Sequence, residues 1–279
     1  MPDDGKNIDK AKQKAIDALN SRIDEMGKAA YTIMLQAIED TFDFKAGKIE
    51  GGKNFIKQLN KLTIEVLDLL QSEPKFSGPV SQFVKRMPAI SEAITDFQKA
   101  TNGISVPAFE TAKKIILDEI VDKMLNNGLN QHFVQPLRDL IYQNVTGGLS
   151  LSDARTQIKE FIQGGKDVSG KLGSYVEQTS QQAADSYSGA INTKLLETFD
   201  YDGLLITGSL IDNSSKQCRF AIEELGGKIT RENWHKVKAI GEKQSGWIQN
   251  TTFDNLPTNR LHWNCRHSFY PFLTKKQTA

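Results

Sequence analysis

Apolar residues recur every three or four positions along most of the first 200 residues, which is the spacing of an amphipathic helix. The first such run spans residues 8–42 and contains no proline. Its stripe positions are Ile8, Ala11, Ala15, Leu19, Ile23, Met26, Ala30, Ile33, Ala37 and Thr41. We therefore predict one helix of roughly 50 Å over this run, with Gly27 as a point where it could break. A helix of that length must lay its stripe against other helices or against another subunit.

A proline-rich stretch follows a second predicted helix over residues 54–71. Residues 72–108 hold four of the eight prolines in the chain. They are Pro74, Pro79, Pro88 and Pro107. Because proline lacks a backbone donor and clashes with the preceding turn, we exclude long helices across these points. A short helix such as residues 89–100 still fits between them.

Helical spacing returns at residue 108 and continues, with interruptions, to Phe199. Asparagine and glycine predict a stop near residues 126–130. The pair Gly147 and Gly148 then ends one helix, and Ser152 is expected to cap the next. Residues 164–173 hold four glycines and form the expected domain boundary, followed by another long helix.

The period changes only after residue 200. Residues 203–211, "GLLITGSLI", are short, apolar and bounded by aspartates, which predicts a buried strand. Residues 226–230, "GGKIT", predict a turn that leads into a second short strand. The expected fold is mainly α, with long amphipathic helices in the N-terminal part and a small α+β module at the C-terminus. We expect a helical region over residues 1–145, a short helix and glycine-rich linker over 146–173, and the module over 174–279.

Composition places the chain among folded, water-soluble proteins, since 38% of its 279 residues are hydrophobic and 25% are charged. The sequence contains no apolar run long enough to span a membrane, and its first residues lack the apolar stretch of a signal peptide. Only Cys218 and Cys265 are available for a disulfide, which is too few for a secreted disulfide framework. We therefore expect free thiols and assembly in the cytoplasm.

Charge is unevenly distributed although the net charge is only +1. From Lys228 onward there are nine Lys/Arg and three Asp/Glu, a local charge of +6, which leaves −5 on the preceding residues. All three tryptophans lie in this basic segment. Basic residues interleaved with aromatics favour nucleic-acid contact. They are also typical of a small domain that has an aromatic core and lysines on its solvent-exposed surface. The contact candidates are Lys236, Lys238, Lys243, Arg260, Arg266, Lys275 and Lys276.

Catalytic signatures are missing from the sequence. It contains no GxGxxG after a strand, no GxxxxGK[ST], no HExxH and no GxSxG. The acidic residues sit at helical spacing close to lysines, as on solvated helix faces. We predict no catalytic and no cofactor-binding residues, and we do not expect an enzyme.

Residues 260–272, "RLHWNCRHSFYPF", concentrate reactive side chains near the end of the chain. His262, Cys265 and His267 together with Cys218 make a formally sufficient ligand set for a structural zinc ion. The spacing His-x2-Cys-x-His is not a common knuckle, and residues two apart in an extended segment point to opposite faces. A Cys–His nucleophile and a Cys218–Cys265 disulfide are further alternatives. We favour a turn held by hydrogen bonds, with Cys265 buried as a small apolar residue, Asn264 at a left-handed position, and Arg266 binding carbonyls or a carboxylate.

The C-terminal third resembles the phage Mu F-like minor head (head morphogenesis) proteins of tailed bacteriophages. That family shows a helix with an "RTE"-like segment, a short strand, a "D-x-R-x-x-C" element followed by "L-x-G-K", and a terminal "H-x-N-C-R-C/H". The corresponding pieces are "VEQTSQQAADSYSGAINTKLLETFDYDGLLITGSLIDNSSKQCRFAIEELGGKIT" and "NRLHWNCRHSFYPF", and the resemblance covers residues 146–272. Three positions depart from the family pattern. The arginine before the first cysteine is Lys216, the helix arginine is replaced around Gln178 and Thr179, and the second terminal cysteine is His267.

This resemblance implies a structural minor head protein inside the capsid of a virion, at or near the portal vertex, in several copies. Its expected partners are the portal protein, the major capsid protein and packaged double-stranded DNA, with no membrane, and its expected role is in head assembly, DNA packaging or ejection. We expect assembly in the cytoplasm of a bacterial host. The alternatives are a nucleic-acid-binding module, or an effector packaged in the virion and delivered with the DNA. Since only seven residues follow Phe272, we expect no fused effector domain.

Overall fold

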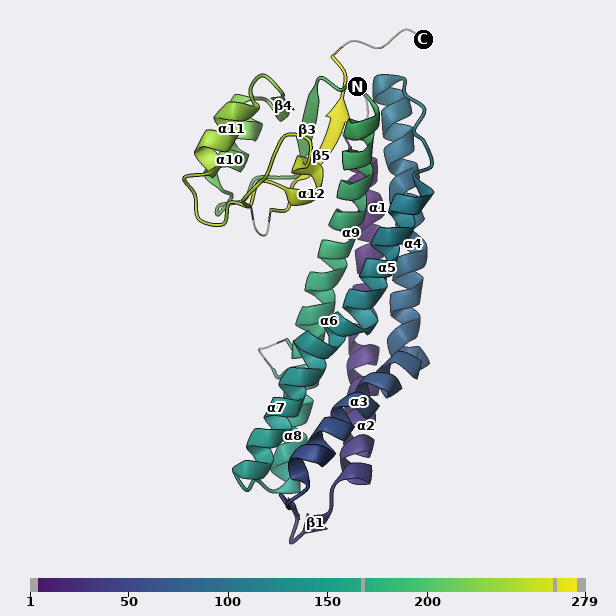
Figure 1. Cartoon of the computed structure of the whole chain (residues 1–279), viewed down its shortest axis with the longest axis vertical. Helices are drawn as coiled ribbons and strands as arrows, with labels where there is room; N and C mark the ends of the chain where they lie inside the picture. The colour runs from purple at the N-terminus through teal and green to yellow at the C-terminus, as the bar shows by residue number, and fades with distance from the viewer. Residues whose placement is uncertain (1–4, 167–168, 263–264, 275–279) are drawn as a thin grey trace. The chain divides into compact units, whose positions relative to one another are not determined.

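The computed structural model describes residues 5–166, 169–262 and 265–274 and confirms a mainly α protein with a small α+β module (Figure 1). The chain forms two compact units, each assembled from separate stretches of sequence. We call residues 1–14, 86–117 and 183–279 the sheet unit, and residues 15–85 and 118–182 the bundle unit. The sheet unit contains most of the module expected over 174–279. None of the described helices combines the length and the apolarity needed to cross a membrane.

The predicted helix over residues 8–42 is two helices, α1 (Lys6–Asn20) and α2 (Ile23–Thr41). The helix breaks at Ser21 and Arg22, and not at Gly27, which lies buried inside α2. The amide of Arg22 bonds the carbonyl of Leu19 at 2.9 Å, a tightened last turn that ends α1. The amide of Met26 then bonds the carbonyl of Arg22 at 3.0 Å and begins α2.

The helix expected over residues 54–71 is confirmed as α3 (Phe55–Ser72), but the exclusion of long helices after it was wrong. Helix α4 (Pro74–Asn102) runs for 29 residues with Pro79 and Pro88 inside it. Pro74 stands at its first position, where proline costs no hydrogen bond. The missing bonds are offset by an apolar stripe whose members are buried. They are Phe76, Val80, Phe83, Met87, Ile90, Ile94 and Phe97.

The next helices follow the sequence prediction closely. Helix α5 (Glu110–Leu125) ends where asparagine and glycine predict a stop, and the one-turn α6 (Asn127–Leu129) and π-helix η1 (Asn130–Val134) lead into α7 (Gln135–Thr146). Helix α8 (Leu151–Gln163) is capped by Ser150, whose hydroxyl accepts the amide of Asp153 at 3.1 Å, and not by Ser152. The long helix expected after the glycines is α9 (Lys171–Thr198).

The bundle unit is built from α2, α3, α7 and α8, with α2 packed against both α3 and α8. Its buried side chains include Met26, Met34, Leu59, Leu62, Val66, Phe133, Leu137, Ile141, Ile158 and Ile162. Each such side chain contributes about 1.5–3 kcal/mol when it leaves water. A hairpin of β1 (Phe44–Lys45) and β2 (Lys48–Ile49) joins α2 to α3.

The sheet unit contains three antiparallel strands in the order β4-β3-β5, drawn green to yellow in Figure 1. Strand β3 (Gly203–Thr207) is the centre, β4 (Lys228–Thr230) is the second predicted strand, and β5 (Ser268–Phe272) was not predicted. The first predicted strand is shorter than residues 203–211 because the chain turns at Gly208, with φ +110°. The short elements beside the sheet are α10 (Lys216–Arg219), η2 (Phe220–Glu224), α11 (Trp234–Gly241) and α12 (Leu256–Asn259).

Edge strand β5 is anchored to helix α4 by buried amide side chains. The carbonyl of Pro271 accepts Nε2 of Gln98 at 3.0 Å and Nδ2 of Asn102 at 3.1 Å. The Asn102 side-chain oxygen accepts the amide of Leu273 at 2.9 Å, and Tyr201 donates to Gln98 at 2.9 Å. These buried polar groups therefore satisfy one another where β5 has no further strand to pair with.

Replacing either of two helical glycines by alanine should change the stability of the protein, in opposite directions. A Cβ at Gly189 in α9 would lie 2.4 Å from the carbonyl oxygen of Pro257, whereas one at Gly78 in α4 meets open space. We expect Gly189→Ala to lower the free energy of unfolding by about 1–3 kcal/mol through overpacking. The control Gly78→Ala should raise it by up to about 1 kcal/mol through helix propensity. Urea unfolding followed by circular dichroism measures both, and equal stability of the two variants would refute the close approach.

Candidate metal centre

Helix α10 and the segment between α12 and β5 hold the predicted ligand residues and bring them together in the sheet unit. Cys218 lies in α10, a one-turn helix whose N-cap Ser215 accepts the amide of Cys218 at 3.4 Å. His262 and Cys265 lie in the loop after α12, and His267 directly precedes β5. This loop precedes β5, which pairs with β3, and α10 follows β3 along the chain. The strand pairing therefore brings the loop close to α10.

Two of the distances between these ligand atoms match those of tetrahedral zinc ligands. Sγ of Cys218 lies 3.9 Å from Sγ of Cys265, and Sγ of Cys265 lies 3.6 Å from Nδ1 of His267. Around one tetrahedral zinc ion, two thiolates are about 3.8 Å apart and a thiolate and an imidazole nitrogen are about 3.5 Å apart. The ligand atoms of Cys218, His262 and Cys265 all lie within 4.8 Å of one another. This Cys–His–Cys cluster can therefore bind a metal ion.

His267 has the features of a fourth ligand, although it lies outside the group of three. Its side chain is buried, and Nδ1, 3.6 Å from Sγ of Cys265, is the ring nitrogen that contacts the cluster. The other ring nitrogen, Nε2, has no hydrogen-bond partner among the described residues. The objection that residues two apart point to opposite faces does not apply, because the extended strand begins only at Ser268. The backbone before it lets Cys265 and His267 approach each other.

The two thiols share a hydrogen bond in which either sulfur can be the donor, and their pKa values shift in opposite directions. The hydrogen bond with Cys218, with smaller contributions from His262 and His267, holds the pKa of Cys265 well below its ordinary value despite burial. The same hydrogen bond to Cys265, together with burial, raises the pKa of Cys218. The shared hydrogen bond thus favours one thiolate in the pair, and the thiolate is the form that coordinates metals.

The other interpretations of residues 260–272 fare differently. Both thiols are free, so the structure contains no Cys218–Cys265 disulfide. A turn is present, since the amide of Cys265 bonds the carbonyl of His262 at 3.1 Å. A residue with positive φ precedes this turn, Arg260 with φ +64°, while Asn264 lies outside the described residues. The arginine that binds a carbonyl and a carboxylate is also Arg260, whereas Arg266 is exposed.

The candidate DNA contacts are dispersed over the sheet unit. Lys236 and Lys243 are exposed, and Lys238 lies 3.7 Å from Glu242 in a half-exposed ion pair. Arg260 is largely buried in its pairing with Asp185, and its DNA contact stays a prediction. Lys275 and Lys276, like Trp263, lie outside the described residues. Most aromatics of the basic segment are core residues, as the buried residues Trp247, Phe253, Phe269, Tyr270 and Phe272 show.

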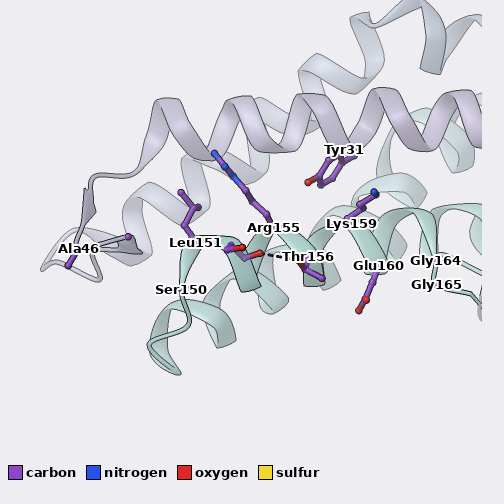
Figure 2. A pocket seen from close by; sticks show the side chains of 12 residues that line it. Tyr31, Ala46, Ser150, Leu151, Arg155, Thr156, Lys159, Glu160, Gly164 and Gly165 are labelled. Atoms are coloured by element: carbon purple, nitrogen blue, oxygen red, sulfur yellow. Dashed lines mark hydrogen bonds between the residues drawn. The ribbon is translucent and has the colours of Figure 1, made fainter.

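A surface hollow of about 780 Å³ lies in the bundle unit (Figure 2). Arg155 and Lys159 extend from α8 toward α2, which contributes Tyr31. Arg155 forms an ion pair with Glu39 of α2, and the hydroxyl of Thr156 donates to the carbonyl of Ser152 at 3.1 Å. These contacts explain the polar lining as part of the packing of α2 against α8.

Comparisons with known proteins identify no relative. No protein-family model matches the chain, and no curated protein and no solved structure matches it.

The thiol pair predicts an early titration in the metal-free folded protein. We expect one thiolate per chain to form at a pH below the free-cysteine pKa of about 8.5, because the hydrogen bond between the two sulfurs stabilises a thiolate. Thiolate ultraviolet absorbance across a pH series measures it. Cys265→Ala should remove the step and Cys218→Ala should move it to higher pH, whereas two thiols titrating as ordinary cysteines would contradict the arrangement.

Proposed function

We propose that this chain is a structural minor head protein of a tailed bacteriophage, and that its C-terminal segment folds around a structural zinc ion. One observation carries the proposal. The two motif segments that resemble Mu F-like proteins meet in one unit, with the thiols of Cys218 and Cys265 3.9 Å apart across 47 residues of chain. A shared core or a shared ion explains why both segments occur together.

The ligand set supports a structural role for the ion. Cys218, His262, Cys265 and His267 supply four ligands, and a four-coordinate site leaves no open position for a substrate. Both thiols are buried, and His262 is half-buried. The ion would join α10 to the loop before β5, and its binding energy would become folding energy of the sheet unit.

Protein partners are supported by the surface of the bundle unit. Ile56 and Ile64, two turns apart on α3, are 50% and 65% exposed. Apolar side chains on one exposed helix face favour contact with another protein. We assign this surface to the portal protein or the major capsid protein, with the chain inside the head near the portal vertex in several copies.

Packaged DNA is the partner proposed for the sheet unit. Lys236, Lys243 and Arg266 are exposed, and basic side chains neutralise phosphates without the need for a catalytic group. The aromatic side chains that are buried in the core cannot stack on bases. We therefore propose contact with the DNA backbone in assembly, packaging or ejection, and no enzymatic activity.

The metal part of the proposal is tested by elemental analysis of the purified full-length protein. We expect one zinc ion per chain and its loss in Cys218→Ser and Cys265→Ser, because each variant removes a thiolate ligand. His235→Gln, at an exposed histidine on α11, is the matched control and should retain zinc. A wild-type protein without zinc, or full zinc content in both serine variants, would overturn this part.

The location is tested on purified, tail-complete particles of the phage that encodes the chain. We expect the protein in a few copies per particle and cross-linked to the portal or major capsid protein. Recovery of a free monomer bound to DNA alone would instead support the nucleic-acid-binding module. Transfer of the protein into the host cell with the DNA would support the effector.

A further inference from the structure

Arg260 adopts a backbone conformation that a residue with a side chain rarely takes. It follows α12 with φ +64° and ψ −179°. This region is costly for any residue except glycine, so the surrounding structure must hold Arg260 there. The guanidinium of Arg260 provides the attachment.

The guanidinium connects the loop that holds His262 and Cys265 to a buried carboxylate. Nη1 of Arg260 donates to the carbonyl oxygen of Cys265 at 2.6 Å, and Nη2 lies 2.9 Å from Oδ2 of Asp185 on α9. The Arg260 side chain is 18% exposed and that of Asp185 is 6% exposed. Because the guanidinium is planar, the two contacts fix its orientation and with it the carbonyl of Cys265.

A lysine from the N-terminal helix extends the same connection. Nζ of Lys12 on α1 lies 2.7 Å from Oδ1 of Asp185 and donates to Oγ of Ser268 at 2.6 Å. The Lys12 side chain is 7% exposed. Asp185 therefore stands between two cations, one at Cys265 and one at the residue after His267.

We propose that Arg260 and Asp185 are positioning residues that set the metal affinity of the cluster, with Lys12 supporting Asp185 from α1. This inference rests on the zinc ion of the proposed function. The carboxylate of Asp185 holds Cys265 in place through Arg260 and Ser268 in place through Lys12. The segment that carries the ligands Cys265 and His267 is therefore fixed at both ends. Residues that orient ligands in this way typically change metal affinity by about 10–100-fold when removed.

The experiment measures zinc affinity of the full-length protein by competition with a chromophoric chelator. We expect Arg260→Gln to weaken zinc binding by about 10–100-fold. Arg260→Lys should show an intermediate loss, because one ammonium group keeps the charge beside Asp185 but cannot reach both acceptors. The matched control is Arg231→Gln, which breaks an exposed 2.7 Å pair with Asp254 and should leave the affinity unchanged.

Cobalt substitution separates positioning from stability alone. If Arg260 positions Cys265, the visible absorption bands of the Co²⁺ protein should shift in Arg260→Gln and partly recover in Arg260→Lys. Should Arg260→Gln fail to fold, Arg260→Lys supplies both measurements. Affinity within twofold of wild type and an unchanged Co²⁺ spectrum would overturn the positioning role while leaving the zinc site intact. A wild-type protein that binds neither ion would overturn the zinc site and this inference together.

Discussion

Pairing of β3 with β5 is the interaction on which the sheet unit depends. Its register runs from Gly203 opposite Phe272 to Thr207 opposite Ser268, so it joins the start of the module to its last described strand. This register places the carbonyl of Pro271 at the amides on α4 and brings the loop at Cys265 to Cys218. A shift by one residue would turn every β5 side chain to the opposite face and separate these contacts. The convergence of the Cys–His–Cys cluster thus depends on strand register.

Sequence periodicity predicted the helices well where packing and propensity agree. The apolar stripe of α9 and the turn residues around α7 and α8 are local signals, and the fold class follows from them. It failed where tertiary packing decides, as at Pro79 and Pro88, whose lost hydrogen bonds are outweighed by a buried stripe on α4. Strand β5, with sequence SFYPF, was missed because Pro271 argues against a strand and the reactive residues before it suggested a turn, and because its pairing partner lies over 60 positions earlier.

The candidate site was predictable as a residue set but not as an arrangement. Cysteines and histidines can be identified in the sequence, and Cys218, His262 and Cys265 do converge. Their supporting groups could not be found in this way. Lys12 and Asp185 look like ordinary members of helical charge patterns, and only the fold shows that both are buried, that they pair with each other and that Asp185 also pairs with Arg260. The turn and the metal interpretations also prove compatible, because the turn is what brings His262 close to Cys265.

The discontinuity of the sheet unit has a consequence for biosynthesis. The bundle unit ends at Gln182, so all of its residues have left the ribosome while the last strand is still untranslated. The sheet unit combines residues that are far apart in the sequence, and its central strand lacks its long partner until residue 272 has been made. Tyr270 donates to Asp9, so α1 acquires this native neighbour only after 261 further residues have been synthesised. Vectorial synthesis therefore delays the folding of this unit relative to that of the bundle unit.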